Sequence, residues 1–245
     1  MPFPVETFFA APLIALCAYT ILGISGFGSA LVTIPLLAHF LPLTTVVPMV
    51  VVVDFIATFT TGARFRGDVE TAELKTVIPA MLIGVLAGVA LLRWLPGETL
   101  VGFLGMVVAA YGVYRFREPP AVRLISPKWG YVTGLSGGIA GGLFGVGGPI
   151  YAMYMARRTH DYARMRATMS AIFAVSTGFR ILVFFITGFL LQAQVWWTVA
   201  LILPFMFIGL NVGHRLHGRL KRKHLSVFVS LLLVASGLSL VARAF

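Results

Sequence analysis

The sequence predicts an all-α integral membrane protein built from two inverted-topology repeats, each a glycine-broken re-entrant helical hairpin followed by three transmembrane helices. Three observations carry this prediction. The 245-residue chain is 59% hydrophobic and 11% charged, with a mean hydropathy of +0.95, whereas soluble domains carry about 25% charged residues. Apolar runs long enough to cross a bilayer follow one another along the chain. Glycine-rich stretches interrupt two of these runs.

Eight apolar segments make up a single membrane domain, 1–245. A spanning helix needs about 20 apolar residues. Six segments fit one simple crossing, whereas the first and the fifth are longer and contain the glycine stretches, so we expect seven to eight predicted spans. In chain order the segments cover residues 8–40, 43–62, 76–95, 99–115, 129–156, 166–187, 194–213 and 224–243.

The order of these segments occurs twice. A broken segment and three plain ones occupy about 8–117, and the same order recurs over about 129–243. The matched glycines are Gly23, Gly26 and Gly28 with Gly142, Gly145 and Gly147, and Gly84 and Gly88 with Gly209 and Gly213. Self-similarity of this kind indicates an internal repeat.

Basic residues gather in the short loops at 63–75, 115–128, 157–166 and 214–224. Lys and Arg mark the cytoplasmic side of a membrane protein. Because both loops beside the fifth segment are basic, that segment is expected to enter and leave from the cytoplasm as two half-helices hinged at its glycines. The uncharged loop at 41–43 places the first broken segment on the opposite side, with both termini outside. The alternative is eight helices that each cross the membrane once. That arrangement would place one of the two basic loops, 115–128 or 157–166, outside the cell.

The charge pattern and the missing motifs exclude several classes of protein. The net charge is +11, but it lies in loops between apolar segments, which indicates topology and a lipid bilayer rather than nucleic acid. The sequence contains no P-loop, no metal-ligand spacing and no hydrolase motif. We therefore expect no enzyme activity, no cofactor and no metal. The sequence is compatible with a homo-oligomer.

The glycine breaks themselves predict a binding site. Irregular backbone at membrane depth is tolerated where it is buried or lines a cavity, and a matched pair of breaks points to the substrate site of a secondary transporter. Free amides at a half-helix N-terminus bind anions. The alternative is close helix packing, which we favour for Gly84, Gly88, Gly134, Gly138, Gly142, Gly209 and Gly213. The candidate substrate-binding residues are Ser25, Gly26, Phe27, Gly28, Ser29, Phe144, Gly145, Gly147, Gly148 and Arg180.

Asp54 and Arg180 lie inside apolar segments. A charge at the bilayer centre costs about 2.5–3.5 kcal/mol on insertion scales, so such residues face the protein interior and serve function. Two interpretations stay open. Asp54 and Arg180 pair with each other, or Arg180 attracts an anionic substrate while Asp54 couples transport to protons.

The broken helices run from Gly23 into Ile34-Pro35-Leu36-Leu37 and from Gly142 to Met155, and Gly67-Asp68-Val69 follows the second segment. With the duplicated four-element plan, they resemble the TauE/SafE family of sulfite and organosulfonate exporters. The resemblance implies an exporter of a small anion, such as sulfite or a C2 sulfonate like sulfoacetate, that works by alternating access across the bacterial inner membrane. A passive small-anion channel and a permease for a non-sulfur organic anion are the alternatives.

Overall fold

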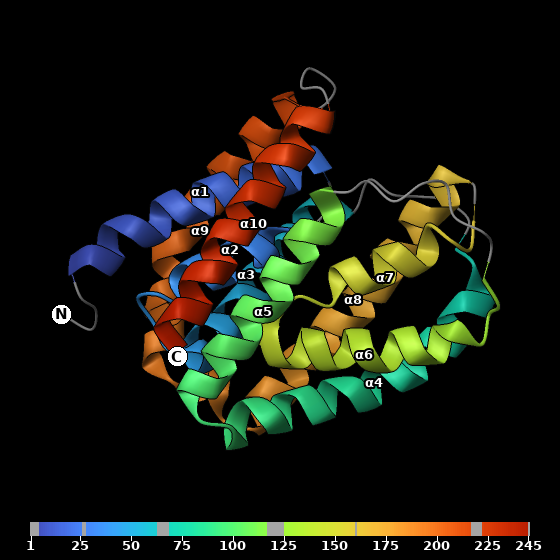
Figure 1. Cartoon of the computed structure of the whole chain (residues 1–245), viewed down its shortest axis with the longest axis horizontal. Coiled ribbons are helices and arrows are strands. Elements are labelled where there is room, and N and C mark those ends of the chain that lie inside the picture. The colour runs from blue at the N-terminus through green and yellow to red at the C-terminus, as the bar shows by residue number, and fades with distance from the viewer. Residues whose placement is uncertain are drawn as a thin grey trace.

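A computed structural model describes residues 5–25, 28–62, 69–116, 125–159, 161–216 and 222–244. In these ranges every regular element is a helix, which confirms the predicted all-α class (Figure 1). The elements are α1 (Val5–Ser25), α2 (Ser29–Leu37), α3 (Leu43–Gly62), α4 (Thr71–Trp94), α5 (Gly97–Phe116), α6 (Trp129–Phe144), α7 (Gly148–Met155), α8 (Tyr162–Ile186), a short 3₁₀ helix (Phe189–Leu191), α9 (Ala193–Leu216) and α10 (Arg222–Ala244).

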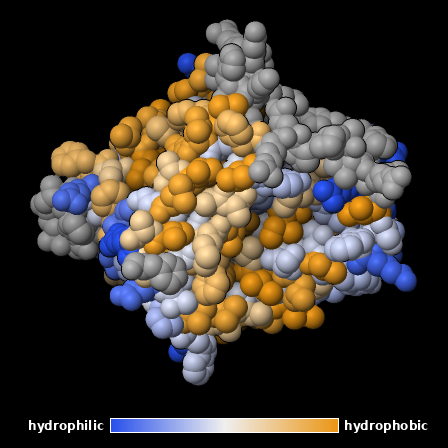
Figure 2. Space-filling model, in the orientation of Figure 1, coloured by the Kyte–Doolittle hydropathy of each residue, from blue (hydrophilic) through white to orange (hydrophobic). Residues whose placement is uncertain are grey.

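Seven of these helices, α1, α3, α4, α5, α8, α9 and α10, are long and apolar enough to cross a membrane. This agrees with the seven to eight spans predicted. Large apolar side chains such as Phe9, Trp94 and Ile186 lie on the outside of the molecule, and Figure 2 shows orange surface over much of one face. An exterior of this kind suits lipid as the surrounding solvent.

Each broken segment folds back on itself as a hairpin. At the end of α7, the Arg158 guanidinium donates through Nη1 to the carbonyl of Ile125, 2.8 Å away and just before α6 begins. In the first segment, Ala10 of α1 and Leu36 of α2 line the same groove. The arms are unequal, however, with 21 and 9 residues in α1 and α2 and 16 and 8 in α6 and α7. Helix α1 is long enough to span by itself, because the glycines come late in its segment, and the re-entrant course of this segment through the bilayer stays a prediction.

Glycine seams hold the two halves of the chain together. Helix α4 packs along α6, and α1 packs along α9. A Cβ at Gly142 would lie 2.6 Å from the carbonyl oxygen of Val85, and one at Gly23 would lie 2.8 Å from that of Leu210. Only glycine permits backbones to approach so closely. The packing interpretation is confirmed for these seams, whose glycines include Gly84, Gly88, Gly134, Gly138, Gly209 and Gly213.

The contacts between the halves are reciprocal. Gly88 of α4 lies against Gly142 of α6, and their repeat counterparts, Gly213 of α9 and Gly23 of α1, lie against each other in the same way. Helices α5 and α10 also run side by side (Figure 1). Such contacts are expected when two structurally related halves pack against each other, because each half contacts the other through equivalent helices. The inversion of one half relative to the bilayer stays a prediction.

One end of the molecule carries Arg158 and Arg164, and we call it the basic end. There the starts of α4 and α8 are joined by the 3.4 Å pair of Arg164 with Glu70. At the other end, Arg243 of α10 donates to the carbonyl of His39 at 2.7 Å. The first and last helices, α1 and α10, have their outer ends toward this second end (Figure 1), and the side of the membrane on which the termini lie stays a prediction.

A buried polar cluster closes the basic end. Glu73 of α4 is 5% exposed and accepts hydrogen bonds from the Tyr154 hydroxyl and from Arg158 Nε. The hydrogen bond to Glu73 raises the pKa of the Arg158 guanidinium, so this group stays charged.

Changing Glu73 to Gln should lower the free energy of unfolding by about 1–3 kcal/mol, because a buried charged partner of Arg158 is lost. The matched control is Glu70→Gln, which removes the carboxylate from the more exposed ion pair with Arg164. It should change the free energy of unfolding by less than about 1 kcal/mol. Thermal unfolding in detergent measures both variants. Equal losses would contradict the structural role given to Glu73.

Candidate functional site

A cavity of about 100 Å³ lies where the two hairpin turns meet α3 and α8. The second turn lies against α2 of the first hairpin, since a Cβ at Gly145 would lie 2.5 Å from Ile34 Cδ1. The cavity is lined by Leu22, Gly28, Ser29, Ala30, Leu31, Asp54, Thr58, Gly141, Gly145, Val146, Gly147, Gly148, Pro149, Tyr151, Phe173, Ser176, Thr177 and Arg180.

Asp54 lies on the α3 side of this cavity and is held by two hydroxyl groups. The Tyr19 hydroxyl of α1 and the Ser29 hydroxyl at the start of α2 each donate to Asp54 Oδ1 at 2.8 Å. Both hydrogen bonds end on one oxygen atom. The carboxyl group is thus oriented by residues from both arms of the first hairpin.

Arg180 of α8 also lines the cavity and is 6% exposed. Its Nη1 donates to the carbonyl of Gly141 at 2.8 Å, which fixes the guanidinium beside the second turn. Its Nε atom and the hydroxyl of Tyr151, which is 1% exposed, are buried and have no hydrogen-bond partner among the described residues. A buried polar atom without a partner costs about 1–3 kcal/mol, so these groups mark a place for a ligand.

Asp54 and Arg180 share the cavity without forming an ion pair. Among the described residues, none of the ion pairs within 4.0 Å involves Asp54 or Arg180. The two charges still act on each other electrostatically, so mutual pairing and separate roles both stay predictions. The cavity presents an acidic group from α3 and a basic group from α8.

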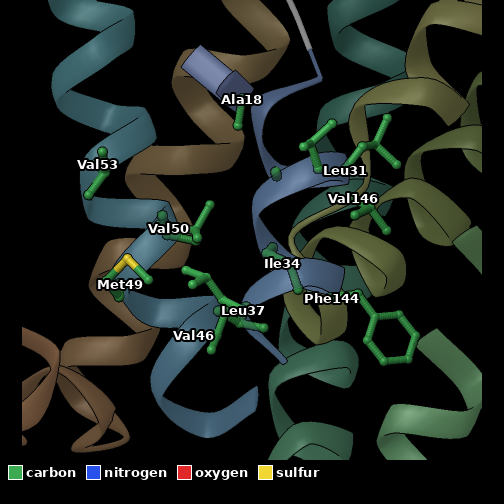
Figure 3. Close-up of a cluster of buried hydrophobic side chains, with 14 of the residues drawn as sticks. Ala18, Leu31, Ile34, Leu37, Val46, Met49, Val50, Val53, Phe144 and Val146 are labelled. Atoms are coloured by element: carbon green, nitrogen blue, oxygen red, sulfur yellow. The ribbon is translucent and has the colours of Figure 1, made fainter. Parts of the chain in front are cut away.

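Most candidate residues from the sequence meet at this cavity. Gly28, Ser29, Gly145, Gly147, Gly148 and Arg180 line it, as does Asp54. Phe144 does not, because it is buried in the apolar cluster drawn in Figure 3. Gly26 and Phe27 lie outside the described residues, and so does the side chain of Ser25.

The glycines of the turns differ in what they permit. Gly28 has φ of 103°, and nothing would lie within 4 Å of its Cβ, so its side toward the cavity is open. At Gly148 a Cβ would lie 3.3 Å from the ring of Phe173. At Gly147 it would overlap the carbonyl of Gly137. Gly147 therefore lines the cavity and is also required for packing.

Helices α2 and α7 both begin at the cavity, and no side chain caps either of them. Pro149 occupies the first turn of α7, where its missing N–H leaves no hydrogen bond of the helix unmade. The amides of Ile150 and Tyr151 both donate to the carbonyl of Gly147, at 3.1 and 3.4 Å. In α7 these two amides are therefore occupied, and the side chains of Arg180 and Tyr151 supply donors beside them.

Comparison with known proteins places the chain in a family. The family model for "Sulfite exporter TauE/SafE" matches residues 11–240. The chain belongs to the TauE/SafE family. It is also 30% identical over 183 residues to the "Probable inner membrane transporter protein TsaS" of Comamonas testosteroni, a match that covers 73% of this chain and 75% of that protein. No solved structure matches the chain.

The TauE/SafE assignment and the seven apolar helices make the chain a multi-pass inner membrane transporter. The structure adds cavity residues that the sequence reasoning missed: Thr58, Tyr151, Phe173, Ser176 and Thr177, with Tyr19 behind Asp54. A signal for some of them was present. Thr58 follows Asp54 by one helical turn, and Ser176 precedes Arg180 by one turn, so each polar pair lies on one helix face. Among the described residues, no group of His, Cys, Asp or Glu could hold a metal ion.

Proposed function

We propose that this TauE/SafE member is a secondary transporter that exports a small anion, such as sulfite or a C2 sulfonate, by alternating access. One observation carries the proposal. Arg180 Nε and the Tyr151 hydroxyl are buried and unpartnered where the two hairpin turns meet. Such donors in a low-dielectric cavity bind a negatively charged oxygen strongly.

The cavity has room for an oxyanion. About 100 Å³ of it is open to the centres of water-sized molecules, whereas about 10–15 Å³ by this measure holds one water molecule. The volume accommodates sulfite and also a C2 sulfonate such as sulfoacetate, so we expect both to compete in the transport assay.

The relative from Comamonas testosteroni carries the name of an inner membrane transporter, which supports the same location for this chain. We place the basic end of the molecule in the cytoplasm by the positive-inside rule. Both termini are then periplasmic. The reciprocal contacts of the halves support an inverted repeat, the arrangement that produces alternating access in many secondary transporters. Asp54, beside the cavity, is the group proposed to couple transport to protons.

Counterflow of labelled sulfite in proteoliposomes tests this function. Vesicles loaded with unlabelled sulfite should transiently accumulate label in a saturable manner, whereas protein-free vesicles should not. A passive channel conducts without such accumulation. Transient accumulation of label would therefore favour a carrier. Flux without counterflow or saturation would overturn the proposal in favour of the channel. Competition by sulfoacetate and by a carboxylate of equal size reports the substrate class.

A further inference from the structure

We infer that the site selects anions that carry an O–H group, hydrogen sulfite among them, because Asp54 receives the proton of that group while Arg180 and Tyr151 bind the anionic oxygens. This inference rests on the proposed function and names the chemical form of its substrate. It follows from the unlike chemistry of the two sides of the cavity.

The Asp54 side of the cavity offers an acceptor. Its Oδ1 atom already accepts from Tyr19 and Ser29, and each hydroxyl has a single proton to donate. Both donors point their protons at the carboxyl group, so neither is available to an anionic substrate. A ligand that reaches this side therefore meets a carboxyl group and must bring a donor of its own.

The Arg180 side offers donors. Arg180 Nε carries a proton without a partner, and the Tyr151 hydroxyl is unpartnered as well. Arg180 Nη1 donates to the Gly141 carbonyl, and Asp54 acts on the guanidinium electrostatically without an ion pair within 4.0 Å among the described residues. This side therefore attracts the negative oxygens of the substrate.

A bare oxyanion satisfies only one of these sides. Its oxygens accept from Arg180 and Tyr151, but an oxygen that turns toward Asp54, which lines the same cavity, is repelled by the carboxylate. A hydrogen-oxyanion of the same shape avoids the repulsion, because its O–H donates to the carboxyl group. A site built to pair with a substrate hydroxyl rejects the analogue that lacks it.

A matched pair of inhibitors tests the inference in the full-length protein. At mildly acidic pH selenite is mainly hydrogen selenite, a pyramidal monoanion with an O–H group, and chlorate is a pyramidal monoanion without one. We expect hydrogen selenite to inhibit labelled sulfite counterflow at a concentration at least about tenfold below that of chlorate. Equal potency in the wild-type protein would overturn the inference.

The variant Asp54→Asn tests the residue assigned to the selection. The amide oxygen can still accept from Tyr19 and Ser29, while the amide nitrogen now donates toward the cavity. Chlorate should become as potent as hydrogen selenite or more so. Glu98→Gln makes the same chemical change at an exposed position on α5 and should keep the wild-type ratio. An unchanged ratio of chlorate to hydrogen selenite potency in Asp54→Asn would overturn the role of Asp54. If the variant protein is not produced in folded form, the potency ratio of the wild-type protein decides.

Two further outcomes are separable. Absence of sulfite counterflow in the wild-type protein contradicts the proposed function itself, whereas counterflow without preference for hydrogen selenite contradicts this inference alone. The assay is run in sodium and in potassium buffers. A selectivity that appears only with sodium would show that Asp54 binds the cation rather than the substrate hydroxyl, and would overturn the inference.

Discussion

Changing Arg180 to Gln should reduce saturable sulfite counterflow by about 100-fold while the protein remains monodisperse in detergent. The Gln side chain ends at the position of Arg180 Nε, so the Nη1 donor to the carbonyl of Gly141, now 2.8 Å away, is lost together with the positive charge. A hydrogen bond to a charged group contributes about 1.5–3 kcal/mol. Initial rates of counterflow in proteoliposomes measure the loss.

Two further variants show whether the effect belongs to the cavity. Arg93→Gln removes an exposed arginine near the end of α4 and should leave transport unchanged. Arg180→Lys keeps the charge but not the planar set of donors, so it should recover part of the rate. Wild-type transport by Arg180→Gln would show that the anion does not bind at this guanidinium.

A single methyl group at Gly138 should destabilise the protein strongly, whereas the same change at Gly178 should not. A Cβ at Gly138 would overlap the backbone carbonyl of Met81 and lie 3.0 Å from Gly84 Cα. Helices α4 and α6 would have to separate, and overpacking of this kind costs about 1–3 kcal/mol. At Gly178, in α8, nothing lies within 4 Å, so alanine should stabilise that helix by up to about 1 kcal/mol.

Thermal unfolding followed by size-exclusion chromatography in detergent compares Gly138→Ala with Gly178→Ala. Both changes add the same atoms within a helix, so helix propensity cannot account for opposite signs. Equal midpoints for the two variants would contradict the backbone contact between α4 and α6.

The glycine pattern carried most of what the sequence revealed about the fold. Gly84 and Gly88 recur as Gly209 and Gly213 because both pairs allow close helix contact, and this requirement is local enough to be visible in spacing. The length of each arm was less predictable. Nothing in the apolar composition of residues 8–40 showed that α1 would continue to Ser25 and leave only 9 residues for α2.

The candidate site was predictable only in part, because its geometry depends on contacts far apart in sequence. Asp54 and Arg180 were identifiable as charges in apolar segments. Tyr19 and Tyr151 were not, since a tyrosine in an apolar helix is also a common core residue. Only folding shows that the Tyr19 hydroxyl reaches Asp54 while that of Tyr151 is left without a partner.

The seams between α1 and α9 and between α4 and α6 determine which parts of the protein can move. Each seam joins a helix of the first half to one of the second at backbone distance, so the two halves are intertwined. Rotation of one half against the other would pull both seams apart. We therefore expect the mixed pairs, α1 with α9 and α4 with α6, to move as rigid bodies, with the cavity at the starts of the short arms α2 and α7. The two repeats in the sequence are therefore not the two units that we expect to move, because each moving unit contains a helix from both repeats.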